Sequence, residues 1–209
     1  MIMDYINTLD SKEAAKPVIS DQTSKEASKP IISAKKICMV AFAIVLNVIG
    51  GQIALMLHLP IYLDSMGTIL IAILYGPVYG ILPPLLYGLV MGLTMDIFSL
   101  YFMPVGIVLG LVTGIVARAF PLRKWKIIPG ALFITIPGTI VSTIITTVLF
   151  GGITSSGSAV LVQVLNKMGL GLTASVFLVQ ILTDYLDRLL SLFLIDRLLR
   201  IIPASVYSD

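Results

Sequence analysis

The side chains most able to do chemistry in this sequence are carboxylates beside long apolar runs. Asp64 lies near the start of one run and Asp96 lies at the end of another. An ionisable group at membrane depth is costly and is usually retained for function. Asp64 either accepts a hydrogen bond from a ligand or caps a helix. Asp96 sits where its charge opposes a helix dipole, so both residues are candidate ligand contacts.

Other candidates gather at the same predicted membrane boundary. Tyr62, Tyr101 and Phe102 either form an interfacial aromatic belt or stack on a planar ligand. His58 is the only histidine, and it is either a solvated loop residue or a ligand contact. The segment 151–171 is rich in Gly, Ser and Thr, and a loop of this length is often functional. It would close over a pocket as a lid, with three further candidates: Gln163, Asn166 and Lys167.

Gln180 lies within another apolar run, where it either contacts a ligand or makes an interhelical hydrogen bond. The residues after it carry several charges. We expect that charged stretch to be a solvated or snorkelling helix end, or to face another protein. Its members are Asp184, Asp187, Arg188, Asp196 and Arg197.

Composition excludes a soluble monomer. Of the 209 residues, 57% are apolar and only 12% are charged, against about 25% charged in a soluble domain. One cysteine and one histidine exclude a disulfide framework and make a metal site improbable. A net charge of +3, with basic residues at membrane edges, is not typical of nucleic-acid binding. No catalytic motif or facing carboxylate pair with a base is present, so we expect a non-enzyme.

The elements that position these side chains are apolar segments long enough for membrane helices. With no period-two strands, backbone hydrogen bonding in lipid leaves a helical bundle. The sequence therefore predicts an all-α, polytopic membrane protein with six transmembrane helices in one bundle. Their ranges are 37–57, 62–75, 78–99, 104–120, 127–150 and 172 to about 199.

Basic residues predict the orientation, because Lys and Arg concentrate in cytoplasmic loops. Lys35 and Lys36 precede the first segment, Arg123, Lys124 and Lys126 separate the fourth from the fifth, and the last segment ends in arginines. The opposite side carries only Lys167. This pattern places the N and C termini in the cytoplasm and the chain in the cell membrane.

The predicted domain organisation has three parts. Residues 1–34 form a flexible cytoplasmic tail, in which Ser11–Ser20 recurs as Ser24–Ser33 with eight of ten positions identical. Prolines stop any helix there. Residues 35–203 form the membrane domain, and residues 204–209 form a C-terminal tail.

One short motif points to a family. The stretch Leu59-Pro-Ile-Tyr-Leu-Asp-Ser-Met-Gly-Thr68 is followed by an apolar run that ends in Gly76-Pro77, and glycines punctuate the next segment at Gly80, Gly88 and Gly92. With six predicted helices, this pattern resembles the substrate-binding S component of energy-coupling factor (ECF) vitamin transporters over residues 37 to 200.

The resemblance implies a non-catalytic transport subunit of a prokaryotic plasma membrane. Such a subunit binds a vitamin on its external side and docks on a transmembrane coupling subunit driven by two ATPase subunits. ATP and Mg²⁺ then belong to the partners, and this chain holds no cofactor or metal. The family often docks through Ala-x-x-x-Ala on its first helix. The nearest matches here are Ala43, Asn47, Gly50 and Ala54, whose alternative role is packing within their own bundle.

The cargo follows from charge complementarity. Carboxylate vitamins would need Arg or Lys, and the predicted external half offers only Lys167. The sole tryptophan, Trp125, is cytoplasmic, whereas thiamine sites in the family are rich in tryptophan. We therefore expect cobalamin, with His58 as a potential cobalt ligand. Riboflavin or another vitamin or precursor, and a membrane sensor or scaffold, are the alternatives.

Overall fold

The computed structural model describes residues 34–154 and 157–201. These residues form helices, and no strand occurs among them. The tail predicted over residues 1–34 lies outside this part of the chain except for Ala34, as do residues 204–209. The helices are α3 (Ala34–Met56), α4 (Met66–Tyr75), α5 (Pro77–Gly80), α6 (Leu82–Thr94), α7 (Ile97–Tyr101), α8 (Met103–Ala119), α9 (Ile127–Phe150), α10 (Ser158–Leu165) and α11 (Leu172–Ile201), with short turns η1 (Lys124–Lys126) and η2 (Asn166–Leu170).

Three helical stretches are long and apolar enough to cross a membrane. They are Ala34–Met56, Pro77–Thr94 and Lys124–Phe150, with 23, 18 and 27 residues. At 1.5 Å per residue, about 20 residues span the hydrocarbon core. The all-helical class is therefore confirmed, and the chain has the character of a helical membrane protein. Six spans remain a prediction, because α4 has only 10 residues.

Helix α4 starts later than its sequence predicts. The predicted segment begins at Tyr62, whereas α4 begins at Met66. Leu63 adopts a positive φ of 54°, and so does His58, at 49°. Non-glycine residues rarely adopt this conformation, and it interrupts a helix. Residues 57–65 are therefore a non-helical segment, called the α3–α4 link below.

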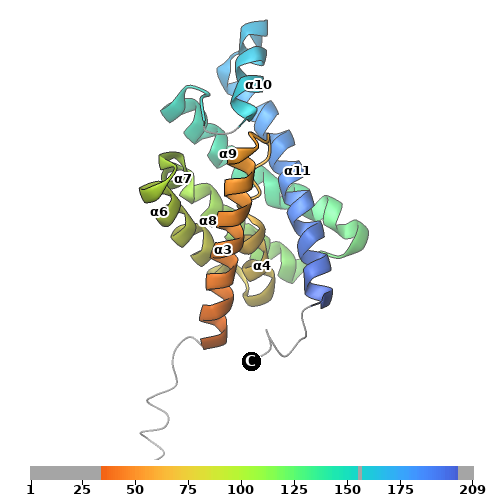
Figure 1. Cartoon of the computed structure of the whole chain (residues 1–209). Helices are drawn as coiled ribbons and strands as arrows, with labels where there is room; N and C mark the ends of the chain where they lie inside the picture. Colours follow the sequence, from red (N-terminus) through yellow and green to blue (C-terminus); the bar gives the residue numbers. More distant parts are fainter. Residues whose placement is uncertain (1–33, 155–156, 202–209) are drawn as a thin grey trace, which may run out of the picture. The chain divides into compact units, whose positions relative to one another are not determined.

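Helix α4 is the centre of the bundle (Figure 1). Its residues from Gly67 to Ala72 are all buried. Around it pack buried side chains of α3, α8, α9 and α11, such as Ala43, Leu109, Ile134 and Leu192. A helix that is apolar on every side must be covered on every side, so this short helix is stable only because longer helices surround it.

Small residues allow the helix backbones to approach closely. A Cβ atom on Gly67 of α4 would lie 1.9 Å from the carbonyl oxygen of Ala43 in α3, and one on Gly110 of α8 would lie 2.1 Å from the carbonyl oxygen of Gly80. Both neighbours are backbone atoms, which cannot rotate away. The α3–α4 and α5–α8 contacts therefore require glycine.

We predict that Gly67→Ala lowers the stability of the bundle by about 1–3 kcal/mol, because the added methyl group forces α3 and α4 apart. Gly138→Ala is the matched control, since a Cβ there would meet only Val105 Cγ1 at 3.9 Å. Thermal unfolding in detergent measures both. Equal midpoints for the two variants would contradict the close α3–α4 contact.

Candidate functional site

Helix α11 has its polar residues inside the bundle and its apolar residues outside. Asp184, Asp187 and Arg188 are only 4%, 0% and 7% exposed. On the opposite face, a row of leucines four residues apart is exposed by 41% to 62%: Leu178, Leu182, Leu186 and Leu190. A helix of a soluble protein shows the reverse arrangement. This reversal is expected where lipid covers the outer face.

The prediction of a solvated charged helix end is therefore wrong for three of its five residues. Asp184, Asp187 and Arg188 face neighbouring helices because their spacing places them on one side of α11. Only the last turns behave as predicted. Asp196 forms an i,i+4 ion pair with the exposed Arg200, and Arg197 lies over the Phe193 ring.

Asp187 joins α11 to the α3–α4 link. Its Oδ1 accepts a hydrogen bond from the backbone N–H of Leu63 at 2.8 Å, and its Oδ2 accepts one from the Ser65 hydroxyl at 3.0 Å. Arg188 Nη1 forms an ion pair with the same carboxylate and also donates to Ser65 Oγ at 2.9 Å. Both carboxylate oxygens of Asp187 are therefore satisfied by neighbours within the bundle.

A second set of polar contacts joins α9 to α11. Thr139 donates to Asp184 Oδ2 at 2.7 Å. Gln180 Nε2 donates to Thr146 Oγ1 at 2.8 Å, and Gln180 Oε1 accepts from Thr143 at 3.2 Å. Gln180 thus makes interhelical hydrogen bonds, which was one of its two predicted roles, and it does not line the cavities described next.

Two neighbouring cavities are lined by the α3–α4 link. Helices α4, α6, α7, α8, α9 and α11 also line the first, and helices α3, α6 and α7 also line the second. The first, called the Asp184 cavity, has about 590 Å³ of empty volume that includes the open space at its mouth. Its polar lining includes Asp64, Ser142, Asp184 and Arg188. The second, called the Asp96 cavity, has about 510 Å³. They share five lining residues: Tyr62, Asp64, Tyr87, Ser99 and Phe102.

Tyr87 lines both cavities and is hydrogen-bonded to two other residues that line both. Its side chain is 7% exposed, and its hydroxyl is hydrogen-bonded to Asp64 and Ser99. Tyr87 belongs to α6, Ser99 to α7 and Asp64 to the link. Three segments of the chain are thus joined at one phenol group, which belongs to a residue that lines both cavities.

Four of the predicted contacts do line these cavities. Tyr62, Asp64 and Phe102 line both, and Asp96 lines the second. Asp96 also caps α7, since its carboxylate accepts from the N–H of Phe98 and the hydroxyl of Ser99, each at 3.3 Å. It begins a new helix, so its charge favours the helix dipole rather than opposing it.

The remaining predicted contacts lie elsewhere. Tyr101 is 47% exposed and packs edge-on against Phe150. His58, Gln163, Asn166 and Lys167 are exposed, and none lines either cavity. The predicted lid contains α10 and η2 instead of being only a loop. Its residues Ala159 and Val162 are buried, and Val162 packs against Val176 and Val179 of α11.

The residues predicted to dock a partner are buried inside the bundle. Ala43 and Asn47 are 0% exposed and Ala54 is 5% exposed. Asn47 donates to Thr68 Oγ1 at 2.9 Å and accepts from the N–H of Gly67 at 2.7 Å. Gly50 faces the carbonyl of Leu63. These four residues therefore form the α3 side of an internal contact, not a docking surface in this conformation.

Sequence reasoning missed Ser65, Thr68, Tyr87, Ser99, Ser142, Asp184 and Arg188 as cavity residues. A helical reading of residues 178–191 could have found two of them, because the charges and the leucines fall on opposite faces of one helix. The hydroxyl residues gave no such signal. No protein-family model, curated protein or solved structure matches this chain.

We predict that Asp187→Ala destabilises the bundle by about 3–5 kcal/mol, because it leaves the buried Arg188 guanidinium without its ion pair. Asp196→Ala removes the exposed pair on the same helix and should cost less than about 1 kcal/mol. Thermal unfolding of both variants in one detergent measures the difference. Similar losses for both would show that the Asp187 contacts carry little stability.

Proposed function

We propose that this protein is the membrane-embedded substrate-binding subunit of an ECF-type vitamin importer. The observation that carries the proposal is the reversed α11 helix, with three ionisable side chains inside an apolar bundle, two of them lining a cavity. Ionisable residues at membrane depth most often mark a ligand or ion pathway. The resemblance in residues 59–77 supplies the family.

The cavities have the properties of a small-molecule site. Drug-sized ligands occupy pockets of about 300–1,000 Å³ that are mostly apolar with a few polar groups. The Asp184 cavity has this mixed lining, because Met103, Val105 and Leu109 stand beside a few polar groups. Aromatic rings of Tyr62, Tyr87 and Phe102 stand beside the carboxylates and Arg188. Such walls suit a planar vitamin with polar substituents.

The geometry favours a smaller cargo than cobalamin. A corrinoid with its nucleotide loop is far larger than a drug-sized ligand, and His58, the proposed cobalt ligand, lines neither cavity. Riboflavin or another compact vitamin or precursor, the alternative cargo from the sequence, is therefore the better candidate. Arg188 also lines the cavity and carries a positive charge. An acidic cargo would therefore find a basic partner there, although the sequence predicted only Lys167 for that role.

In this proposal the chain captures and releases its cargo, and partner subunits supply the energy. ATP and Mg²⁺ bind to the two ATPase subunits, and a coupling subunit contacts this chain through a surface other than the buried Ala43, Asn47, Gly50 and Ala54. The chain itself performs no catalysis.

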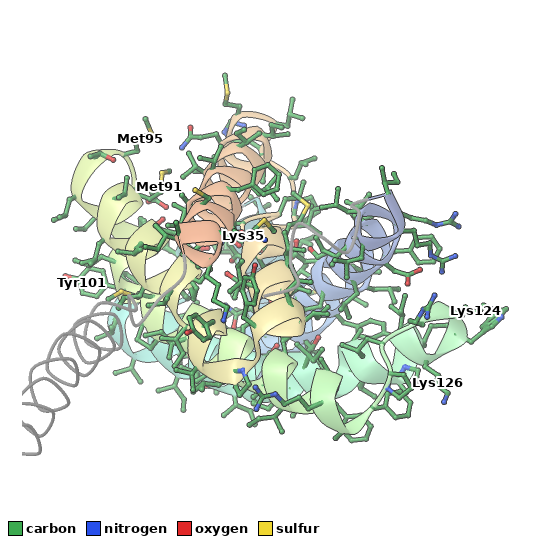
Figure 2. All side chains as sticks on the ribbon, turned by 90° about the horizontal axis from the view of Figure 1, so that it is seen from below. Lys35, Met91, Met95, Tyr101, Lys124 and Lys126 are labelled. Carbon is green, nitrogen blue, oxygen red and sulfur yellow. The ribbon has the colours of Figure 1, made fainter. Side chains whose placement is uncertain are left out.

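The proposal includes an orientation in the cell membrane. Helix α3 begins and α11 ends on the same side of the bundle (Figure 1). Figure 2 looks from that side and labels Lys35 at the start of α3. Lys124 and Lys126, which directly precede α9, complete the basic set that the sequence assigns to the cytoplasm. The positive-inside rule makes this side cytoplasmic.

We predict that a cysteine at Trp125 reacts with a membrane-impermeant maleimide only after cells are permeabilised, whereas one at Met168 reacts in intact cells. Trp125 and Met168 are 82% and 73% exposed, so the comparison is matched. Cys38 is the only native cysteine, and Cys38→Ser supplies the background. The reverse pattern would place the basic side outside and overturn the orientation.

Binding tests the function directly. Riboflavin, thiamine, pantothenate, folate, biotin and cobalamin are titrated separately by calorimetry into the purified protein in detergent. One vitamin should bind tightly. Asp64→Asn should weaken it about tenfold or more, because a charged hydrogen-bond partner in the cavity is lost, and His58→Ala should leave it unchanged.

Silence across the panel from folded protein would count against vitamin uptake. It would favour the sensor or scaffold alternative. Equal losses for Asp64→Asn and His58→Ala would instead move the binding site away from the two cavities.

A further inference from the structure

More carboxyl groups than basic groups surround the Asp184 cavity. Three carboxylates, those of Asp64, Asp184 and Asp187, surround one guanidinium, that of Arg188. Arg188 forms its ion pair with Asp187. Asp64 and Asp184 line the cavity and have neutral hydrogen-bond donors, Tyr87 and Thr139. The cavity wall therefore holds two carboxyl groups that lack an ion-pair partner of their own in the part of the chain that the structure describes, in surroundings that hydrate a charge poorly.

Hydrogen-bond donors also face this cavity without partners. Ser142 is 6% exposed and lines the cavity, and within residues 34–154 and 157–201 its hydroxyl has no hydrogen-bond partner. Arg188 uses only Nη1 for its hydrogen bonds to Ser65 and Asp187, so its Nε and Nη2 groups have no partner in the described chain. These donors are available to an acceptor on a ligand in the cavity.

The residues around the cavity favour an organic cation over a metal ion as the partner of Asp64 and Asp184. In the described part of the chain, no group of three or more His, Cys, Asp or Glu residues is arranged to hold a metal. The cavity is instead walled by the rings of Tyr62, Tyr87 and Phe102. Aromatic faces attract organic cations through cation–π contacts.

We propose that the Asp184 cavity binds a small organic cation that also carries a hydrogen-bond acceptor. The positive group pairs with Asp184 and Asp64 beside the aromatic rings, and the acceptor receives hydrogen bonds from Ser142 and Arg188. This inference rests on the proposed function and narrows its cargo. An anionic cargo would meet two carboxylates, and a neutral one would leave Asp184 without a counter-charge.

Matched pairs of probes test the charge requirement. 1-Methylnicotinamide is a planar cation with an amide acceptor, and nicotinamide is its neutral counterpart. Choline and 3,3-dimethyl-1-butanol form an aliphatic pair with the same relation. Calorimetry on the full chain in lipid nanodiscs should show each cation binding about tenfold or more tightly than its neutral partner, as expected for a poorly hydrated charge pair.

Three variants locate the effect. Asp184→Asn keeps an acceptor for Thr139. It should reduce the ratio between the affinities for each cation and for its neutral counterpart to near one. Ser142→Ala should weaken 1-methylnicotinamide and nicotinamide alike, by about fivefold, through loss of one hydrogen bond. Asp196→Asn, near the C-terminal end of the same helix, should change neither the affinity ratio nor the affinities for the nicotinamide pair. If Asp184→Asn does not fold, the affinities of the wild-type protein for the two probe pairs and the effect of Ser142→Ala still test the proposal.

The outcomes separate this inference from the proposed function. Equal affinity, or no binding, for both members of both pairs overturns the cation assignment. Tight binding of riboflavin or another neutral or acidic vitamin, with no preference for the cations, leaves the importer proposal standing and removes only the charge assignment. A folded protein that binds neither the probe pairs nor any vitamin overturns both.

Discussion

The buried carboxylate of Asp187 is the contact on which the interior of this bundle depends. It accepts hydrogen bonds from the Leu63 N–H and the Ser65 hydroxyl and pairs with Arg188. These contacts hold the α3–α4 link against α11, although 122 residues separate Ser65 from Asp187. The link in turn carries Tyr62 and Asp64, which line both cavities. The Asp187 carboxylate, which has hydrogen-bond donors at both oxygens, thus helps to position the part of the cavity wall formed by the link.

Helix α4 shows why the link must be held. It has 10 residues, and those from Gly67 to Ala72 are buried, so its stability comes from its neighbours rather than from its own length. Asn47 of α3 satisfies the N–H of Gly67, one of the groups that a helix start leaves unpaired. Asp187 satisfies the N–H of Leu63 just before it. The side chains of Asn47 and Asp187 therefore accept the backbone hydrogen bonds that a helix cap would accept in other proteins.

Apolar run length predicted most helix positions, because backbone groups in lipid must pair within the segment. Boundary position also identified Tyr62, Asp64, Asp96 and Phe102 as cavity residues. The spacing of residues predicted partner docking at Ala43 and Asn47, whereas both are buried and Asn47 contacts α4. Spacing alone does not specify which helix makes a close contact. Burial of Asp184, Asp187 and Arg188 required their partners, which come from α9 and from the link. A single sequence offers no direct sign of such pairs.

Two carboxylates of α11 that lie within one helical turn have different surroundings. Asp187 is fully buried and has donors at both oxygens, so it has little left to offer a ligand. Asp184, one turn earlier, has the Thr139 hydroxyl at Oδ2 and faces the cavity. Within residues 34–154 and 157–201, Asp184 therefore keeps one carboxylate oxygen that accepts no hydrogen bond, whereas Asp187 has none to spare. Because burying an unpaired charge is costly, the proposed cationic ligand would stabilise the bundle by pairing with Asp184.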